Sequence, residues 1–145
     1  VRAIKLDKDD EVVSMELVEP EQQLMVVTEN GFGKRTPVEE YKIQVRGGKG
    51  LLTYDKAKFS KTGALIGAMV VDESDEILMI NSDGIIIRIR ANEISKSGRT
   101  TQGVKIMKVE SGDEIVSFAK VLDEDDASKP MTKKEKAESE QMTLV

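Results

Sequence analysis

The sequence predicts an all-β protein built from about two and a half copies of a four-stranded unit, arranged radially like the blades of a propeller. Three observations predict this fold: an internal repeat at an offset of 53 residues, glycine turn signals between apolar runs, and alternation of apolar and polar residues. A repeat of this length is typical of propellers and solenoids. Radial packing of four-stranded units buries the sheet faces and leaves few open edges.

The repeat is visible when residues 24–50 are placed over residues 77–103 without a gap. A second match, at an offset of 103, relates residues 1–14 to residues 104–117. One copy cannot bury its apolar faces alone, so the copies are expected to pack against one another. The identical pairs in the longer match are Gly31/Gly84, Arg35/Arg88, Glu40/Glu93, Arg46/Arg99 and Gly50/Gly103.

These matches divide the chain into a partial unit over residues 1–23, a unit over residues 24–76 and another over residues 77–122. Residues 123–145 are charged and lack apolar periodicity. Such a segment buries too little apolar surface to fold, so we expect a disordered tail. Because Val1 stands in the middle of a repeat, we also expect the chain to be a fragment of a longer protein.

Each unit carries a hairpin signal. The dipeptides Asn30-Gly31 and Asp83-Gly84 stand between apolar runs, and such dipeptides favour a type I′ turn, which needs positive φ at both central residues. After the second turn the sequence GIIIRIR alternates with the period of a strand, so that its two arginines and Ile86 share one face. Further strands are expected at residues 12–18, 51–54, 65–71, 104–108 and 115–121.

Charge is distributed unevenly along the chain. The formal net charge is −5, yet residues 24–108 carry 14 Lys and Arg against 10 Asp and Glu. The flanking segments are acidic, with 3 against 7 in residues 1–23 and 5 against 10 in residues 109–145. Because salt confines the field of each patch to about 10 Å, the basic centre is able to attract a polyanion despite the acidic total.

The chain has no Cys and no His. Their absence removes thiol nucleophiles, disulfides, Cys/His zinc sites and the usual proton shuttle at neutral pH. No apolar run reaches the roughly 20 residues of a membrane-spanning helix, and no signal peptide opens the chain. We therefore expect a cytoplasmic protein, with no catalytic residue and no metal ligand in this chain.

The stretch QVRGGKG, residues 44–50, has two interpretations. Its glycines permit a tight turn, and with Arg46 and Lys49 beside them they also suit a loop that contacts phosphate. It is not a nucleotide-binding P-loop, because no Gly-Lys-Ser/Thr sequence and no strand–loop–helix pattern is present. The sequence leaves the turn and the phosphate loop open.

The segments NGFGKRTPVEEY, SDGIIIRIRANEIS, GRTTQGV and VRAIKLDKDDEVVS resemble the C-terminal domain of the DNA gyrase A protein over residues 1–122. The resemblance implies a β-pinwheel, whose blades exchange strands and whose basic rim wraps duplex DNA. It also implies a parent enzyme, an ATP-dependent type II topoisomerase that contains the gyrase B protein and introduces negative supercoils. ATP and Mg²⁺ then belong to other parts of that enzyme, and this fragment is non-catalytic and needs no cofactor.

The resemblance extends to a hallmark heptad, Gln-Arg-Arg-Gly-Gly-Arg-Gly. QVRGGKG is similar to it, with Val45 and Lys49 as the departures, and its context resembles a late blade. We therefore interpret it as a degenerate copy, with the intact heptad expected upstream of Val1.

Recurrence of arginine at matching positions of the repeat predicts that these side chains project from equivalent points of successive blades and contact DNA. Pairing with Glu40 and Glu93 is the alternative, and Lys34 is the weaker candidate because strand alternation sends it to the other face. The predicted DNA-binding residues are Arg35, Lys42, Arg46, Lys49, Arg88, Arg90, Arg99 and Lys105, and the predicted glycine loop residues are Gly47, Gly48, Gly50 and Gly103.

Two other functions stay open from the sequence. The acidic ends of the chain favour a propeller that binds proteins rather than DNA. Relatives in topoisomerase IV share the architecture that the resemblance implies. In either case, incomplete blades are expected to expose sheet edges, so the fragment is expected to be capable of self-association.

Overall fold

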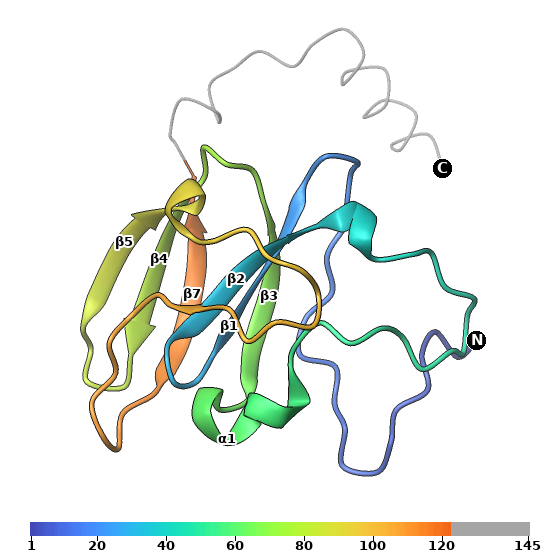
Figure 1. The fold of residues 1–145 in the computed structure, drawn as a ribbon, viewed down its shortest axis with the longest axis horizontal. Coiled ribbons are helices and arrows are strands. Elements are labelled where there is room, and N and C mark those ends of the chain that lie inside the picture. Colours follow the sequence, from blue (N-terminus) through green and yellow to red (C-terminus); the bar gives the residue numbers. More distant parts are fainter. Residues whose placement is uncertain (123–145) are drawn as a thin grey trace, which may run out of the picture.

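The structure, a computed structural model, describes residues 1–122 (Figure 1). It is all-β, as predicted, and the one α-helix in this part of the chain is the four-residue α1 (Phe59–Thr62). The tail predicted at residues 123–145 lies outside the described residues. The strands are β1 (Gln23–Thr28), β2 (Phe32–Pro37), β3 (Leu65–Val71), β4 (Glu76–Asn81), β5 (Ile86–Arg90), β6 (Val104–Lys105) and β7 (Ile115–Val121). Short 3-10 turns cover Val38–Glu40, Lys56–Lys58 and Ala91–Glu93.

The strands form two antiparallel sheets. The first sheet has the order β3-β1-β2-β6 and the second has the order β5-β4-β7. The two sheets pair their strands in the same register. In the first sheet the first residue of β1, Gln23, lies opposite the last residue of β3, Val71. In the second sheet the first residue of β4, Glu76, lies opposite the last residue of β7, Val121. The strand β6 follows β5 in sequence but pairs with β2 of the first sheet. Strand exchange of this kind fits the pinwheel-type architecture.

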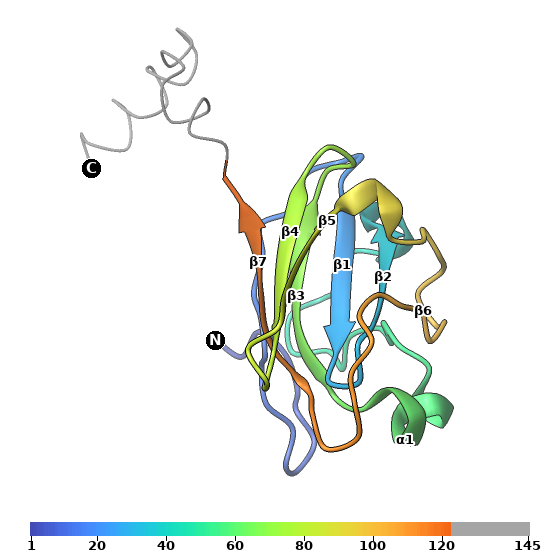
Figure 2. The same cartoon turned by 90° about the vertical axis from the view of Figure 1, so that its left-hand side faces the viewer.

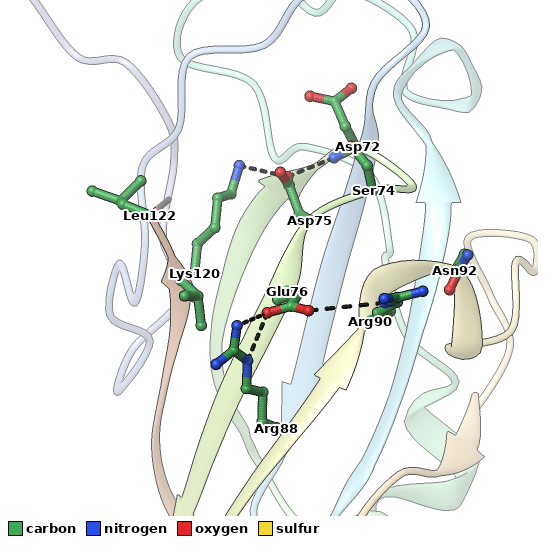
Figure 3. Close-up of a pocket in the computed structure, with 10 residues that line it drawn as sticks. Asp72, Ser74, Asp75, Glu76, Arg88, Arg90, Asn92, Lys120 and Leu122 are labelled. Carbon is green, nitrogen blue, oxygen red and sulfur yellow. Dashed lines mark hydrogen bonds and ion pairs between the residues drawn. The ribbon is translucent and has the colours of Figure 1, made fainter. Parts of the chain in front are cut away.

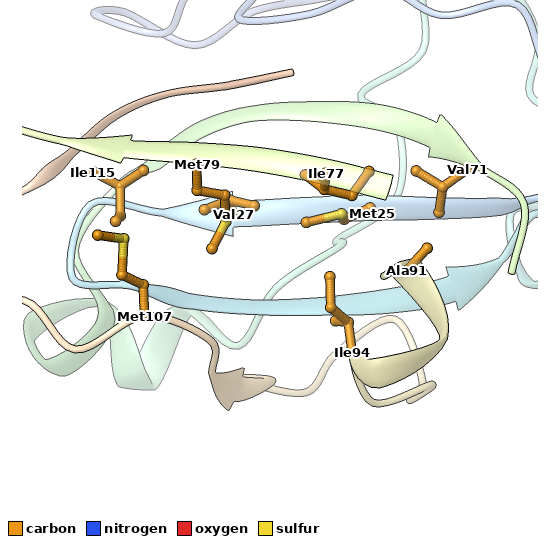
Figure 4. Packing of buried hydrophobic residues seen from close by; sticks show 9 residues of the cluster. All are labelled: Met25, Val27, Val71, Ile77, Met79, Ala91, Ile94, Met107 and Ile115. Atoms are coloured by element: carbon orange, nitrogen blue, oxygen red, sulfur yellow. The ribbon is translucent and has the colours of Figure 1, made fainter. Parts of the chain in front are cut away.

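The core lies between the two sheets (Figures 2 and 4). Met25 and Val27 from β1 face Ile77 and Met79 from β4, and all four side chains are buried. Residues two apart on a strand point to the same face, so each strand contributes one apolar row to the interface between the sheets. The cluster is completed by Val71, Ala91, Ile94, Met107 and Ile115.

Both predicted hairpins are confirmed, since β1 pairs with β2 and β4 pairs with β5. The predicted type I′ turn is wrong, because Gly31 and Gly84 have positive φ while Asn30 and Asp83 do not. Each loop has the glycine alone in the left-handed region, the form typical of a longer hairpin loop that ends in a glycine bulge. In each, the amide of that glycine donates to the carbonyl of the residue three positions earlier.

The strands predicted at residues 65–71 and 115–121 are confirmed, and the one at 104–108 is shortened to β6. The strands predicted at residues 12–18 and 51–54 do not form. Residues 12–18 match β7 in the repeat, and β7 is held by β4, the first strand of its own unit. Among residues 1–122 no such strand pairs with residues 12–18, which instead lie against β3 through the bond from Ser14 Oγ to the carbonyl of Ala68 at 2.9 Å.

Candidate nucleic-acid interface

Arg35 was expected at the surface, and that expectation is wrong. Its side chain is 5% exposed. The guanidinium donates from Nε to the Ile94 carbonyl at 2.8 Å and from Nη1 to the side-chain oxygen of Gln23. It also donates to the Asn92 carbonyl at 3.4 Å and lies 3.7 Å from a carboxylate oxygen of Glu73. A phosphate has no access to a guanidinium that is buried and bonded in this way.

Arg88 stands at the matching position of the repeat, yet its side chain is 58% exposed. Its Nε donates to Glu76 Oε2 at 2.6 Å, and Glu76 matches the Gln23 that holds Arg35. The difference lies in what covers the two arginines. Residues 92–97 lie on β2 over Arg35, and the backbone amide of Arg35 donates to the Ser95 carbonyl at 3.0 Å. Within residues 1–122, no segment bridges to β5 over Arg88 in this way.

The exposed cations of the second sheet are paired with carboxylates (Figure 3). Glu76 contacts Arg88 and also Arg90, whose Nε lies 3.8 Å from Glu76 Oε1. Lys120 lies 2.8 Å from Asp75. These carboxylates already neutralise part of the charge that a phosphate would need. DNA contact by Arg88 and Arg90 stays a prediction, and the pairing weakens it.

Three cations in residues 42–49 are exposed: Lys42, Arg46 and Lys49. Within residues 1–122 none of them has a carboxylate oxygen within 4.0 Å, unlike the cations of the second sheet. Their charge is therefore free to act on a polyanion. We call them the loop cations.

The glycines beside the loop cations shape the chain. Gly47 and Gly50 have positive φ. The Gly47 amide donates to the Ala3 carbonyl at 2.8 Å, and the Gly48 carbonyl accepts from the Lys5 amide at 2.8 Å. The loop is thus tied to the N-terminal segment, and the amide of Gly47 is already occupied. A phosphate at this loop would be held by the side-chain charges, with backbone amides contributing less.

Arg99 and Gly103 lie in the matching segment of the second repeat, which packs across the first sheet. Arg99 is partly buried, its Nη1 donates to the Leu52 carbonyl at 2.7 Å, and its amide donates to Glu40 at 3.2 Å. A Cβ at Gly103 would overlap the Gly33 carbonyl oxygen, so this glycine permits close backbone approach. Glu93 likewise accepts from a backbone amide, that of Arg90, at 3.4 Å.

A second group of exposed cations was missed from the sequence. Lys56 and Lys58 lie in a 3-10 turn and Lys61 lies in α1, where the chain turns into β3. Lys61 and the predicted residue Lys105 both lie over the ring of Phe32, at 5.5 and 5.7 Å from its centre. Within the described residues these four lysines have no ion pair. The signal was the run KAKFSK, with three lysines in six residues. We call Lys56, Lys58, Lys61 and Lys105 the corner lysines.

Lys34 is fully buried and does not face solvent. Its Nζ donates to the Gly98 carbonyl at 2.7 Å and to the Arg99 carbonyl, and it lies 5.7 Å from the centre of the Tyr54 ring. Burial lowers the pKa of this amine from 10.5 to about 8, with Glu40 opposing the shift and Arg99 adding to it. Lys34 therefore anchors the segment that carries Arg99, and it is not a ligand for DNA.

Lys34 predicts a pH dependence of stability. Below about pH 8 the amine is charged in both the folded and the unfolded chain. Between about pH 8 and 10.5 the folded chain loses this proton first, so the free energy of unfolding is expected to rise with pH over that window. In Lys34→Met this contribution is expected to disappear, as measured by denaturant unfolding at several pH values. An exposed control, Lys56→Met, should keep the wild-type pH dependence, and an equal dependence in Lys34→Met would contradict the assignment.

No group of three or more carboxylates in the described part of the chain is arranged to hold a metal ion. Between residues 1 and 122 no helix has the length and hydropathy that crossing a membrane requires.

Two stacked antiparallel sheets joined by strand exchange, with cations gathered in surface loops, define a propeller-like repeat protein of the pinwheel type. The sequence matches the model of one family, described as "DNA gyrase C-terminal domain, beta-propeller", over residues 1–19, 22–72 and 75–121. The chain therefore belongs to the DNA gyrase C-terminal domain family.

Individual relatives agree with this assignment. The chain is 40% identical over 134 residues to the DNA gyrase A protein of Mycolicibacterium smegmatis, a match that covers 91% of the chain and 15% of that relative. A solved DNA gyrase A C-terminal domain superimposes with a TM-score of 0.65 at 31% identity, over 69% of this chain and 33% of that one. The C-terminal domain of a DNA topoisomerase IV superimposes with a TM-score of 0.76 at 22% identity, over 98% of this chain and 42% of that one, a likeness that shows the fold alone.

Proposed function

We propose that this chain is a non-catalytic module that binds duplex DNA and supports wrapping by DNA gyrase. Family membership supports the proposal, and the observation that carries it is the unpaired charge of the loop cations and corner lysines. These two groups together hold seven exposed cations, and the part of the chain that the structure describes offers them no carboxylate within 4.0 Å.

Phosphate neutralisation is the mechanism that these side chains support. Lys and Arg release counterions from DNA when they contact phosphates, which supplies affinity without reading bases. Smooth bending of 20–30 bp costs about 1–6 kcal/mol, so contacts from several repeats are needed to hold DNA in a curve. Aromatic residues make up 3% of the chain, which argues against binding through base stacking.

The catalytic steps of such an enzyme would be carried out by other parts of a longer protein. The chain spans 15% of the length of the M. smegmatis relative. DNA cleavage, ATP hydrolysis and Mg²⁺ binding would lie outside residues 1–145, and the gyrase B protein would be the partner in the assembled enzyme. The site of action would be the bacterial cytoplasm, where supercoiled DNA is the substrate.

The test is a salt titration of duplex binding by the triple variant Lys42→Ala/Arg46→Ala/Lys49→Ala. Each lost phosphate contact is expected to reduce the slope of log K against log salt by about 0.9. The loss should be the same for every duplex sequence, because phosphates carry no sequence information. The matched control is Arg88→Ala/Arg90→Ala, which removes two cations whose charge Glu76 already neutralises in part and should change the slope less.

The same titration separates the proposal from its rivals. An unchanged slope in the triple variant would reduce QVRGGKG to a turn between strands. Substitution of Lys56, Lys58 and Lys61 by Ala then tests whether the corner lysines carry the binding instead. Absence of any salt-dependent binding by the wild-type chain would overturn the proposal and favour a propeller that binds proteins.

A further inference from the structure

The three units differ most in the corner that lies before the last strand of each. The strand β3 ends 21 residues after Gly50, whereas β7 ends 18 residues after Gly103. The middle unit therefore has three extra residues in this corner. Its corner covers residues 55–63, in place of residues 108–113 in the following unit and residues 5–10 in the partial unit before it.

The corner of the middle unit is basic, and the other two are acidic. Residues 55–63 read DKAKFSKTG, with three lysines against one aspartate. The matching stretches read KVESGD, with one lysine against two carboxylates, and KLDKDD, with two against three. The middle corner is also the only one of the three that contains an aromatic residue, Phe59. A polyanion is therefore attracted to this corner rather than to the other two.

Phe59 is presented to solvent in this corner. It is 52% exposed, and no other aromatic residue among residues 1–122 is exposed. Residues 56–61 are all exposed, and none of them is acidic. The helix α1, which begins at Phe59, lies at a corner of the molecule beyond the ends of the strands (Figures 1 and 2). The chain on both sides of the middle unit is described, and none of it covers the ring.

The backbone that carries Phe59 is held by hydrogen bonds. The Gly63 amide donates to the Phe59 carbonyl at 2.8 Å. Asn30, in the loop between β1 and β2, donates from its side-chain amide to the Lys61 carbonyl at 2.9 Å and from its backbone amide to the Thr62 carbonyl at 3.1 Å. A side chain on a backbone bonded in this way loses little conformational freedom when it binds a partner.

Charge surrounds the exposed ring. Lys56, Lys58 and Lys61 all lie within three residues of Phe59, and the described residues place no carboxylate within 4.0 Å of them. The cations continue onto β6, because Lys61 and Lys105 share the ring of Phe32. An apolar side chain among unpaired cations is complementary to stacked bases between two rows of phosphates. Proteins that bind the minor groove insert side chains such as Phe between base steps in this setting.

We propose that Phe59 is a wedge that enters the minor groove of the bound duplex and inserts between two base pairs, while Lys56, Lys58 and Lys61 contact the flanking phosphates. The proposal rests on the duplex binding proposed above and adds a point at which the bend is concentrated. Such a wedge unstacks one base step and kinks DNA by about 20–90°. Pyrimidine–purine steps are the expected position, because they unstack most easily.

One wedge needs only one aromatic ring. The low aromatic content argues against serial stacking of single-stranded bases, which needs several rings, and leaves insertion at a single step possible. A kink at one step also reduces the smooth bending that contacts from the neighbouring repeats have to hold.

Insertion is tested with duplexes that carry 2-aminopurine, a base analogue whose fluorescence rises when it is unstacked. The full chain is added at saturating concentration to a set of duplexes in which the analogue occupies one position at a time around a single TA step. The wild-type chain is expected to raise the fluorescence at that step, and Phe59→Ala to abolish the rise. Phe59→Leu retains an apolar wedge and should keep most of it. The matched control, Ile43→Ala, removes an exposed apolar side chain beside the loop cations and should leave the rise unchanged.

Salt titration of the same variants separates the ring from the charges. Phe59→Ala is expected to weaken duplex binding by about fivefold or more, the order of what contact of one base with an aromatic ring contributes. The slope of log K against log salt should stay as in the wild type, because the ring carries no charge. Lys56→Ala/Lys58→Ala/Lys61→Ala should instead flatten the slope.

The outcomes distinguish this inference from the proposed function. Salt-dependent binding by the wild-type chain with no rise in fluorescence at any position would overturn the wedge and leave duplex binding standing. A rise that persists in Phe59→Ala would overturn the assignment of the wedge to this residue. Unchanged affinity and no rise in either chain would favour a protein partner for the corner. Absence of salt-dependent binding by the wild-type chain would overturn both the wedge and the proposed function.

Discussion

Arg35→Ala is expected to lower the free energy of unfolding by about 3 kcal/mol, and Arg88→Ala at the matching position by less than about 1 kcal/mol. The truncation at Arg35 leaves the carbonyls of Ile94 and Asn92 without their donor. Each buried acceptor that loses its partner costs about 1–3 kcal/mol. The bonds lost also tie residues 92–97 to the first sheet, so the damage spreads to the contact between the repeats.

Because both variants replace an arginine by alanine, residue type cannot explain the expected difference in their free energies of unfolding. Both arginines occupy the same register on the second strand of a hairpin, and each contacts the residue twelve positions earlier. Only the covering segment differs. Denaturant unfolding of the two variants measures the difference directly, with the denaturant slope checked for two-state behaviour. Equal losses at the two sites would show that residues 92–97 contribute little to the stability of the fold.

Structural features that depend on residues adjacent in the sequence could be predicted. The hairpins followed from Asn30-Gly31 and Asp83-Gly84, and the strand at residues 65–71 from its apolar run. These depend on local turn chemistry and strand period, which one sequence displays. The type of turn was wrong because one positive φ at glycine is enough in a longer hairpin loop.

Features set by strand exchange could not be predicted. Arg35 is buried by a segment about 60 residues further along the chain, and no local pattern marks that contact. Lys34 is buried by the same segment. Residues 12–18 have a strand-like sequence and lie against the edge strand β3 through the Ser14 hydroxyl, but they form no ladder of backbone hydrogen bonds with it, and without such a ladder no strand results. The repeat showed which positions were equivalent without showing which of them were covered.

For the candidate site, the loop cations were found because they adjoin a glycine-rich stretch. Lys56, Lys58 and Lys61 could not be predicted from the repeat, because the matching positions 53 residues further along hold no lysine. A DNA-binding surface needs net positive charge at its surface, whatever the repeat position. Local lysine density is therefore a better guide to such residues than recurrence.

The two matching turn glycines predict a second large difference between equivalent sites. Gly103→Ala is expected to lower the free energy of unfolding by about 3 kcal/mol, and Gly50→Ala by about 1 kcal/mol. Both positions have positive φ, so both variants bear the strain of a side chain in that region. At Gly103 the new Cβ also overlaps the Gly33 carbonyl oxygen, which belongs to a paired strand and cannot move without disturbing β2.

At Gly50 the nearest atom to a new Cβ is Ile4 Cδ1, at 3.5 Å, which is ordinary contact with a flexible side chain. Unfolding of dilute protein therefore isolates the backbone collision, which is present at one glycine and absent at the other. A loss at Gly50 as large as that at Gly103 would contradict the predicted difference, because it would show that the positive φ accounts for the whole cost without any collision with the backbone.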